Sequence, residues 1–175
     1  MAQPGFIETL VTSTRIRLAR NLAAYPFPDK LNERLAKEIV YLVGNELEKL
    51  EDFQKNDMAT LSAEEATLLQ EQHLISPALI KKKGIGAAFI STDKSMSLMV
   101  NEEDHLREQY ICKGFALHDA YERLSALDDG FASVLDFAYD RTLGYLTACP
   151  SNLGTGMRAS VMLFLPGLTW NGGIK

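Results

Sequence analysis

The sequence Met-Ser-Leu-Met-Val-Asn-Glu-Glu-Asp-His-Leu-Arg, at residues 96–107, joins a short apolar run to a dense group of charges. The first part, Met96–Val100, predicts a buried strand. Three acids, a histidine and an arginine follow it within Asn101–Arg107. Such a cluster at a strand end can position a charged substrate and accept a proton from it. A solvated acidic turn is the commoner explanation for an arbitrary protein, so the choice depends on the rest of the chain.

The neighbouring segments predict a sheet of mainly antiparallel strands. Ala87–Ser91 is joined to Met96–Val100 by the turn residues Thr92–Ser95, and Arg107–Cys112 is the next expected strand. Further strands are expected at residues 12–21, 144–149 and 157–165. Strand pairs alternate with helices, and no regular strand–helix–strand rhythm is present. We therefore expect an α+β fold with a mainly antiparallel sheet flanked by helices.

Three segments have helical periodicity. The first runs from Asp29, its expected N-cap, to about Leu50. The second begins with a capping box at Ser62 and ends near Gln72. The third is expected from Phe115 to about Asp128, where Asp128-Asp129-Gly130 should interrupt it. The residues expected to point inward from this third helix are Leu117, Ala120, Tyr121, Leu124 and Leu127.

Composition and charge limit the class of protein. The chain has 175 residues and a net charge of −5, so it suits one ordinary domain and not a basic nucleic-acid-binding surface. Cys112 and Cys149 have no metal-site spacing, and no protein metal site is predicted. Met1–Leu10 contains no visible signal peptide, and no apolar run is long enough to span a membrane. We therefore expect a cytoplasmic protein.

An anion site is indicated by alternation in the first expected strand. Arg15 and Arg17 fall on one face of this strand, while Ile16 and Leu18 fall on the other. On this segment alone, a surface strand with solvated arginines is an equal alternative.

The chain lacks the glycine motifs that usually hold nucleotide phosphates. Gly84-Ile85-Gly86 precedes a strand instead of linking a strand to a helix, and no G-x-x-x-x-G-K-[ST] sequence is present. Arginine side chains are another way to hold phosphates, because their planar forks match phosphate oxygens and keep their charge. A nearby carboxylate could orient a nitrogen nucleophile, and a thiolate at Cys149 would add a second negative group facing a cationic substrate.

Three motifs, in this order, resemble those of the ATP:guanido phosphotransferases, the family of the creatine and arginine kinases. They are Ser-Thr-Arg-Ile-Arg at 13–17, Asn-Glu-Glu-Asp-His-Leu-Arg at 101–107, and Cys-Pro-Ser-Asn-Leu-Gly-Thr-Gly-Met-Arg-Ala-Ser at 149–160. The resemblance implies a curved, mainly antiparallel sheet flanked by helices, similar to that of glutamine synthetase. It also implies that ATP and Mg²⁺ are the cofactors.

The same resemblance implies roles for individual residues. Glu103 would orient and deprotonate the guanidinium group, Cys149 would be the reactive cysteine, and Asn152 would shape its loop. The complete expected catalytic set is Glu103, Cys149, Glu102 and Asn152. The expected nucleotide-binding set is Ser13, Thr14, Arg15, Ile16, Arg17, His73, Arg107, Arg158, Ala159, Ser160, Val161 and Met162. In it the four arginines would hold the phosphates and His73 would contact the adenine. His105 is assigned no chemical step.

The choice of substrate depends on the position of the first motif. Small-molecule kinases of this family carry a helical domain before it, whereas here the motif begins at Ser13. The sequences of three segments, Arg15–Asn21, Tyr25–Pro28 and Gly144–Pro150, are similar to those of the bacterial branch of the family that phosphorylates arginine side chains of proteins. That branch implies protein substrates marked for a Clp-type protease, a heat-shock repressor as one target, and a zinc-finger activator. Free-guanidine kinase and inactive nucleotide- or partner-binding fragment remain open alternatives.

Relatives continue beyond the last motif with another loop and a domain associated with dimerisation. We therefore expect residues 1–175 to be the N-terminal part of a catalytic domain, truncated before its remainder, with a homodimer expected for the full-length parent.

Overall fold

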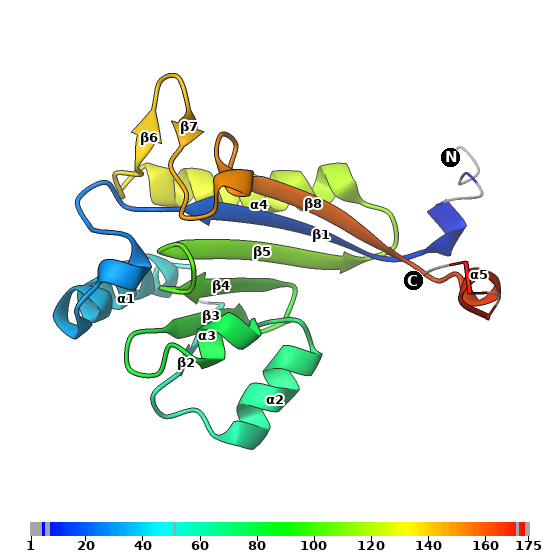
Figure 1. Cartoon of the computed structure of the whole chain (residues 1–175), viewed down its shortest axis with the longest axis horizontal. Helices are drawn as coiled ribbons and strands as arrows, with labels where there is room; N and C mark the ends of the chain where they lie inside the picture. Colours follow the sequence, from blue (N-terminus) through cyan, green and yellow to red (C-terminus); the bar gives the residue numbers. More distant parts are fainter. Residues whose placement is uncertain (1–4, 6–7, 51, 171, 174–175) are drawn as a thin grey trace.

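The computed structural model describes residues 5, 8–50, 52–170 and 172–173. Within them, one sheet contains six antiparallel strands in the order β2-β3-β4-β5-β1-β8 (Figure 1). Their bounds are β1 Val11–Arg20, β2 Phe53–Asp57, β3 Ala87–Ser91, β4 Met96–Val100, β5 Leu106–Lys113 and β8 Met157–Leu163. A separate hairpin pairs β6, Tyr139–Asp140, with β7, Gly144–Tyr145. The expected α+β class with a mainly antiparallel sheet is confirmed.

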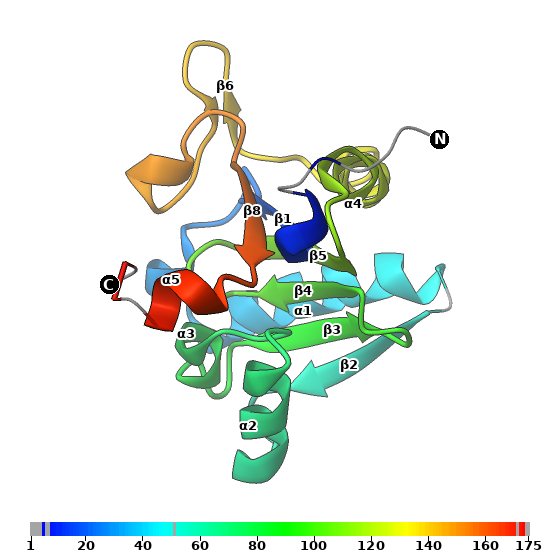
Figure 2. The same ribbon diagram turned by 90° about the vertical axis from the view of Figure 1, so that its right-hand side faces the viewer.

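Helices cover both faces of the sheet (Figure 2). The bounds are α1 Glu33–Glu48, α2 Ala63–Glu71, α3 Pro77–Ile80, α4 Leu117–Ala132 and α5 Pro166–Trp170. The 3₁₀ turns are Glu8–Leu10, Pro28–Lys30 and Pro150–Asn152. Helices α1 and α4 pack on one face and form the main core, whose centre includes Ile16, Ile39, Leu98 and Leu124. On the opposite face, a smaller core around Leu74, Leu79 and Met99 supports α3 and leaves the neighbouring part of the sheet open.

The strand predictions are confirmed at residues 87–91, 96–100 and 107–112, because a short apolar run and a tight turn are both local properties. The strand expected at 144–149 ends at Tyr145, and its continuation is an irregular loop. The edge strand β2 was not predicted. Its burial pattern is mostly exposed or half-buried, so it carries no apolar alternation to identify it.

The helix starting at Ser62 is confirmed, with both hydrogen bonds of its capping box present. The predicted N-cap of the first helix was wrong. Asn32, and not Asp29, caps α1, because its side chain accepts from the Leu35 amide. Asp29 instead lies in a separate 3₁₀ turn and pairs with Lys82 at 2.7 Å.

The predicted interruption of the third helix at Asp128-Asp129-Gly130 was also wrong, since α4 continues through it to Ala132. Asp128 is buried and faces the sheet, where it accepts hydrogen bonds from the Arg20 side chain at 2.7, 2.9 and 3.2 Å. Because Arg20 neutralises its charge, Asp128 can lie on the inner face of α4. Tyr121, expected inward, is 46% exposed, and Leu50 lies beyond the end of α1 and is also exposed.

Among the described residues, no helix combines the length and apolarity needed to cross a membrane. The expectation of no signal peptide concerns Met1–Leu10, of which residues 1–4 and 6–7 lie outside the described residues.

A buried carboxyl group, Glu108, lies beneath α4 next to the Arg20–Asp128 pair. Neither of its oxygens has a hydrogen-bond partner of ordinary geometry among the described residues. Burial, followed by the charge of Asp128, holds the pKa of Glu108 well above its usual range despite the opposing effect of Arg20. Glu108 is therefore protonated and neutral at pH values where most carboxyl groups are ionised.

This raised pKa predicts a pH-dependent stability. The contribution of Glu108 to the free energy of unfolding is fully present below the ordinary carboxyl pKa. It is lost as pH rises towards the pKa of Glu108 in the folded state, by up to about 1.4 kcal/mol per pH unit. Glu108→Gln removes the titration, so the variant should gain stability relative to the unmodified protein between about pH 5 and about pH 8. Urea unfolding at both pH values measures the difference. Glu48→Gln, at an exposed position of α1, is the control and should show no such gain. Parallel curves for Glu108→Gln and the unmodified protein would contradict the assignment.

Candidate functional site

Strand pairing places the predicted arginines on one face of the sheet. Arg17 of β1 lies directly opposite Arg158 of β8, and Ala19 lies opposite Arg107 of β5. Because alternate residues of a strand share a face, Arg15 and Arg17 lie on the same side as Arg107 and Arg158. Ile16 and Leu18 point the other way into the main core, with 2% and 3% of their surfaces exposed. The alternation predicted from the sequence is confirmed.

The arginines are close enough to influence one another electrostatically. Burial, followed by repulsion from Arg15, Arg107 and Arg158, lowers the pKa of Arg17 to about 10. Burial also lowers the pKa of Arg15, with Arg107 and Arg158 adding to the effect. The buried Nε of Arg17 has no hydrogen-bond partner among the described residues. A site with mutually repelling cations and an unused buried donor fits a multiply charged anion such as a nucleotide phosphate chain.

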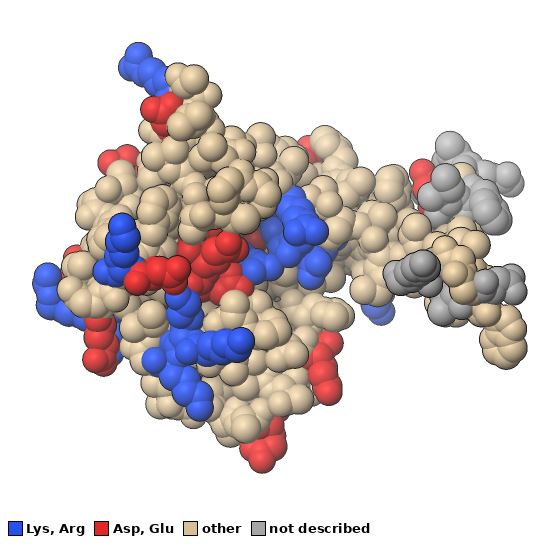
Figure 3. All heavy atoms as spheres, viewed as in Figure 1, with Lys and Arg blue, Asp and Glu red and all other residues tan. Residues whose placement is uncertain are grey.

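A hollow of about 210 Å³ brings most of the predicted catalytic residues next to these arginines. Its lining includes Arg17, Arg107, Arg158, Glu103, Asp104, Cys149, Ser151 and Asn152. Acidic and basic side chains gather side by side on this face of the molecule (Figure 3). One hollow thus combines a place for a phosphate group with a carboxylate and a thiol.

The two adjacent glutamates have different environments. Glu102 is 1% exposed and accepts hydrogen bonds from the Ser76 hydroxyl and from Arg107 Nη1, the latter at 2.7 Å. Burial raises its pKa, but the bonds from Ser76 and Arg107 outweigh that effect, and the net pKa is lowered. Glu102 is thus an ionised group that holds Arg107 in place. Glu103 is exposed and lines the hollow, where its carboxylate can reach a substrate.

A second hollow, of about 440 Å³, lies along the same face. The predicted residues that line it are Ser13, Arg15, His73, Ser160, Val161 and Met162. His73 has a positive φ of 60°, and its carbonyl accepts a hydrogen bond from Gln109 Nε2 at 2.7 Å. Gln109 lies opposite Arg17 in the sheet and thus ties the His73 turn to the strand that also carries Arg107. The size and position of this hollow suit the nucleoside part of a nucleotide.

Three residues of the expected nucleotide-binding set lie elsewhere. The side chain of Thr14 is on the opposite face, where its hydroxyl donates to the Gly114 carbonyl and accepts from the Ala116 amide. Ile16 is in the main core, and Ala159 is its cross-strand partner on that same face. These side chains cannot contact a ligand in either hollow.

Cys149 begins the 3₁₀ turn Pro150–Asn152 and is half-buried. Its sulfur lies 3.0 Å from the Ser151 hydroxyl, a partner that the sequence analysis did not identify. Cys112 packs against the main core, and burial raises the pKa of its thiol. Of the two cysteines, Cys149 is the one that lines the hollow.

His105 is a structural residue. Its Nδ1 accepts from the Leu22 amide at 3.0 Å, so Nε2 carries the proton and donates to the Pro26 carbonyl at 2.9 Å. Burial lowers its pKa in spite of the opposing effects of Pro26 and Asp104. The neutral ring anchors the chain after β1 and is unsuited to proton transfer at the hollow.

No group of three or more metal-ligating side chains occurs in the part of the chain that the structure describes. Mg²⁺ in nucleotide enzymes commonly binds through substrate phosphates, water and one or two carboxylates. Glu103 and Asp104 are the carboxylates at this hollow, and Asp104 is already hydrogen-bonded within the protein. The residues present therefore fit a metal ion that arrives with its nucleotide.

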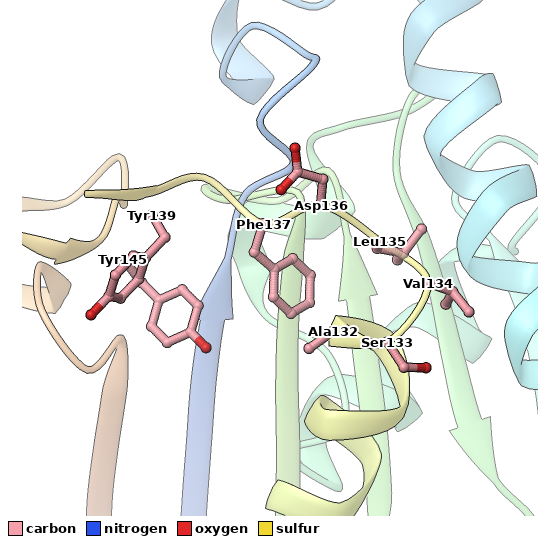
Figure 4. Close-up of a pocket in the computed structure, with 8 residues that line it drawn as sticks. All are labelled: Ala132, Ser133, Val134, Leu135, Asp136, Phe137, Tyr139 and Tyr145. Atoms are coloured by element: carbon pink, nitrogen blue, oxygen red, sulfur yellow. The ribbon is translucent and has the colours of Figure 1, made fainter. Parts of the chain in front are cut away.

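Another hollow, of about 550 Å³, has none of these groups in its lining. It lies between the C-terminal end of α4 and the β6–β7 hairpin, and its lining includes Phe137, Tyr139 and Tyr145 (Figure 4). It contains none of the predicted site residues, and we do not assign the chemistry to it.

Comparison with known proteins identifies relatives in sequence and in fold. A family model described as "ATP:guanido phosphotransferase, C-terminal catalytic domain" matches residues 34–175. A protein-arginine kinase of Brevibacillus brevis is 44% identical over 173 residues, covering 96% of this chain and 48% of that protein. A protein-arginine kinase of Clostridium acetobutylicum is 45% identical over 171 residues, covering 93% of this chain and 49% of that protein.

Among solved structures, the substrate-free duplicated taurocyamine kinase from Schistosoma mansoni matches with a TM-score of 0.83 and 28% identity. The match covers 96% of this chain and 26% of the taurocyamine kinase chain. The chain spans about half the length of the curated relatives that it matches.

Proposed function

This chain belongs to the ATP:guanido phosphotransferase family, and on that premise we propose that it forms part of a kinase that phosphorylates arginine side chains of proteins. The observation that carries the proposal is the single hollow in which Glu103 and Cys149 face Arg17, Arg107 and Arg158. The relatives named protein-arginine kinase, at 44% and 45% identity, support a protein-bound arginine as the substrate.

The arginines have the binding role in this proposal. The phosphate groups of ATP are held by four arginines, Arg15, Arg17, Arg107 and Arg158. ATP binds together with Mg²⁺ and supplies the phosphoryl group. Their mutual repulsion without an anion, expressed in the lowered pKa values of Arg15 and Arg17, is relieved when phosphate binds. Because phosphoryl transfer depends mainly on positioning and electrostatic stabilisation, this cluster supplies much of what the reaction needs.

The carboxylate and the thiol have the substrate role. Glu103 accepts hydrogen bonds from the substrate guanidinium group, orients its nitrogen towards the phosphates and takes up the proton that the nitrogen loses. Cys149 faces the same cation, and Asn152 shapes the turn that presents it. Glu102 positions Arg107 through their 2.7 Å ion pair. His73, with Ser13, Ser160, Val161 and Met162, receives the nucleoside part in the neighbouring hollow.

The wider role follows from the same proposal. We infer a cytoplasmic enzyme whose phosphorylated products are passed to a Clp-type protease, with a heat-shock repressor among its targets and a zinc-finger protein as activator. We also infer that residues 1–175 form the N-terminal part of the catalytic domain and that the complete enzyme is a homodimer.

The test uses the complete gene product with ATP, Mg²⁺ and an arginine-rich protein. Protein-bound phosphate that is acid-labile and located on arginine by mass spectrometry is expected. Absence of phosphoarginine would overturn the proposal. Faster phosphorylation of free arginine than of the protein would assign the site to a small guanidine instead, and ATP binding without transfer would leave a binding module.

A further inference from the structure

Asn21 is a buried polar residue at the end of β1 that the predicted site does not include. Its exposed fraction is 2%, yet every side-chain polar group has a partner. Its Nδ2 donates to Asp104 Oδ1 at 2.6 Å and to the Leu146 carbonyl at 3.0 Å. Its Oδ1 accepts from the His105 amide at 2.9 Å. One side chain thus joins the segment after β4 to the segment after β7.

Those two segments carry the groups that meet a substrate. Glu103 immediately precedes Asp104, and Cys149 immediately follows Ala148. Asp104 Oδ1 accepts from the Ala148 amide at 2.7 Å, as well as from Asn21. The neighbours of Glu103 and Cys149 are therefore joined by one hydrogen bond, from the Ala148 amide to Asp104. Asn21 sets the orientation of the Asp104 carboxylate that accepts this bond.

The Cys149 loop has few other attachments at this end. Its base is closed by Tyr145 and Gly154, which exchange backbone hydrogen bonds of 2.8 and 3.4 Å. Between them, the Leu146 carbonyl accepts from Asn21, and the Ala148 amide donates to Asp104. The Leu146 amide also donates to the Ala138 carbonyl at 2.9 Å. Removing the amide of Asn21 leaves Asp104 free to rotate and loosens the loop just before Cys149.

We propose that Asn21, acting through Asp104, is a positioning residue that sets the separation of Glu103 and Cys149 across the hollow. The catalytic consequence rests on the proposed function, since it assumes that these two groups act on one substrate. The nucleotide contacts are assigned to residues of β1, β5, β8 and the His73 turn, and the Asn21 side chain bonds instead to Asp104, His105 and Leu146. Loss of Asn21 therefore acts on turnover and not on ATP affinity.

The first experiment compares Asn21→Ala with the unmodified complete protein. A small misplacement of reacting groups costs on the order of 10²-fold in rate, and a fall of that size in kcat is expected. The dissociation constant for ATP should stay within about twofold of the original. Ser91→Ala is the matched control, because it removes buried hydroxyl hydrogen bonds at the β3–β4 turn without touching the hollow. Its kcat should be unchanged.

A second experiment separates positioning from simple loss of stability. Asn21→Asp alone places two carboxylates at hydrogen-bond distance and should impair turnover. Asp104→Asn is the companion variant, because its amide oxygen can still accept from both Asn21 and Ala148. Asn21→Asp should therefore change the reactivity of Cys149, whereas Asp104→Asn should leave it close to that of the unmodified protein. These variants decide the matter if Asn21→Ala does not fold.

A third readout does not depend on kinase activity. The rate at which iodoacetamide alkylates Cys149 should change in Asn21→Ala and Asn21→Asp, while that of Cys112 stays constant. If the unmodified protein makes no phosphoarginine, the proposed function fails, whereas this readout still tests the positioning of Cys149. The inference is overturned if Cys149 reactivity is unaltered. A kcat loss matched by an equal loss of ATP affinity, or a change of Cys149 reactivity in Asp104→Asn as large as that in Asn21→Asp, would overturn it as well.

Discussion

Glu103→Gln in the complete protein is expected to lower kcat by about 10²- to 10⁴-fold, the usual contribution of a positioned general base. The amide has nearly the shape of the carboxylate but cannot accept the guanidinium proton. Glu103 is exposed, and the hydrogen bond recorded for it runs from its backbone amide to Glu102, so the substitution should leave the fold intact. The rate of phosphoarginine formation measures the effect, and calorimetry should show unchanged ATP binding.

The control for this experiment is Glu122→Gln, at an exposed position of α4 where the carboxylate lies 3.3 Å from His118 Nε2. It makes the same chemical change on the opposite side of the sheet and should leave kcat unaltered. If Glu103→Gln keeps the turnover of the unmodified protein, Glu103 does not take the proton. If ATP binding weakens as much as turnover, its role is in nucleotide binding.

Arg20→Met is expected to reduce the free energy of unfolding by about 3–5 kcal/mol, because it leaves the buried carboxylate of Asp128 without its partner. The Arg20 side chain is 4% exposed and that of Asp128 is 10% exposed, at an N–O distance of 2.7 Å. The same guanidinium group donates to the carbonyls of Ala19 and Thr155 and lies 3.7 Å above the Tyr145 ring. Its loss therefore affects β1, α4 and the loop after Cys149 together.

Urea unfolding of the complete protein measures this change. Arg34→Met is the matched control, since the Arg34–Glu38 pair is long, at 3.9 Å, and its arginine side chain is 80% exposed. An exposed pair of this kind contributes about 0–1 kcal/mol. Adding Asp128→Leu to Arg20→Met removes the stranded charge and should recover part of the loss. Equal stability of Arg20→Met and Arg34→Met would show that the buried pair does not support the fold.

The part of the site that could be predicted from the sequence depends on patterns among residues close together in the chain. The alternation of Arg15 and Arg17 with Ile16 and Leu18 predicts two faces, because side chains of a strand point alternately to opposite sides. The same rule explains the limits of the motif-based set. Thr14 and Ile16 belong to the same motif as Arg15 and Arg17, yet the pleat turns their side chains away from both hollows.

Other parts depend on contacts between distant residues. Asp128-Asp129-Gly130 has the composition of a helix break, and it is helical because Arg20, 108 residues earlier, neutralises Asp128. Asn21 has no periodicity or motif of its own to indicate that it joins Asp104 to Leu146. Adjacent glutamates at 102 and 103 are likewise equivalent in sequence. Only the approach of Ser76 and Arg107 makes one of them a buried support and leaves the other exposed.

The sequence by itself determined the strand faces, the capping box at Ser62 and the three motifs that identify the family, since each depends on residues close together in the chain. The tertiary structure alone decided which groups share a hollow and which hold them there. Glu103 and Cys149 are far apart in sequence and meet because the β5–β1–β8 register and the Asn21–Asp104 hydrogen bond bring their loops together. Such contacts form only when a buried polar group of one segment finds its partner in another segment, a condition that no local pattern records.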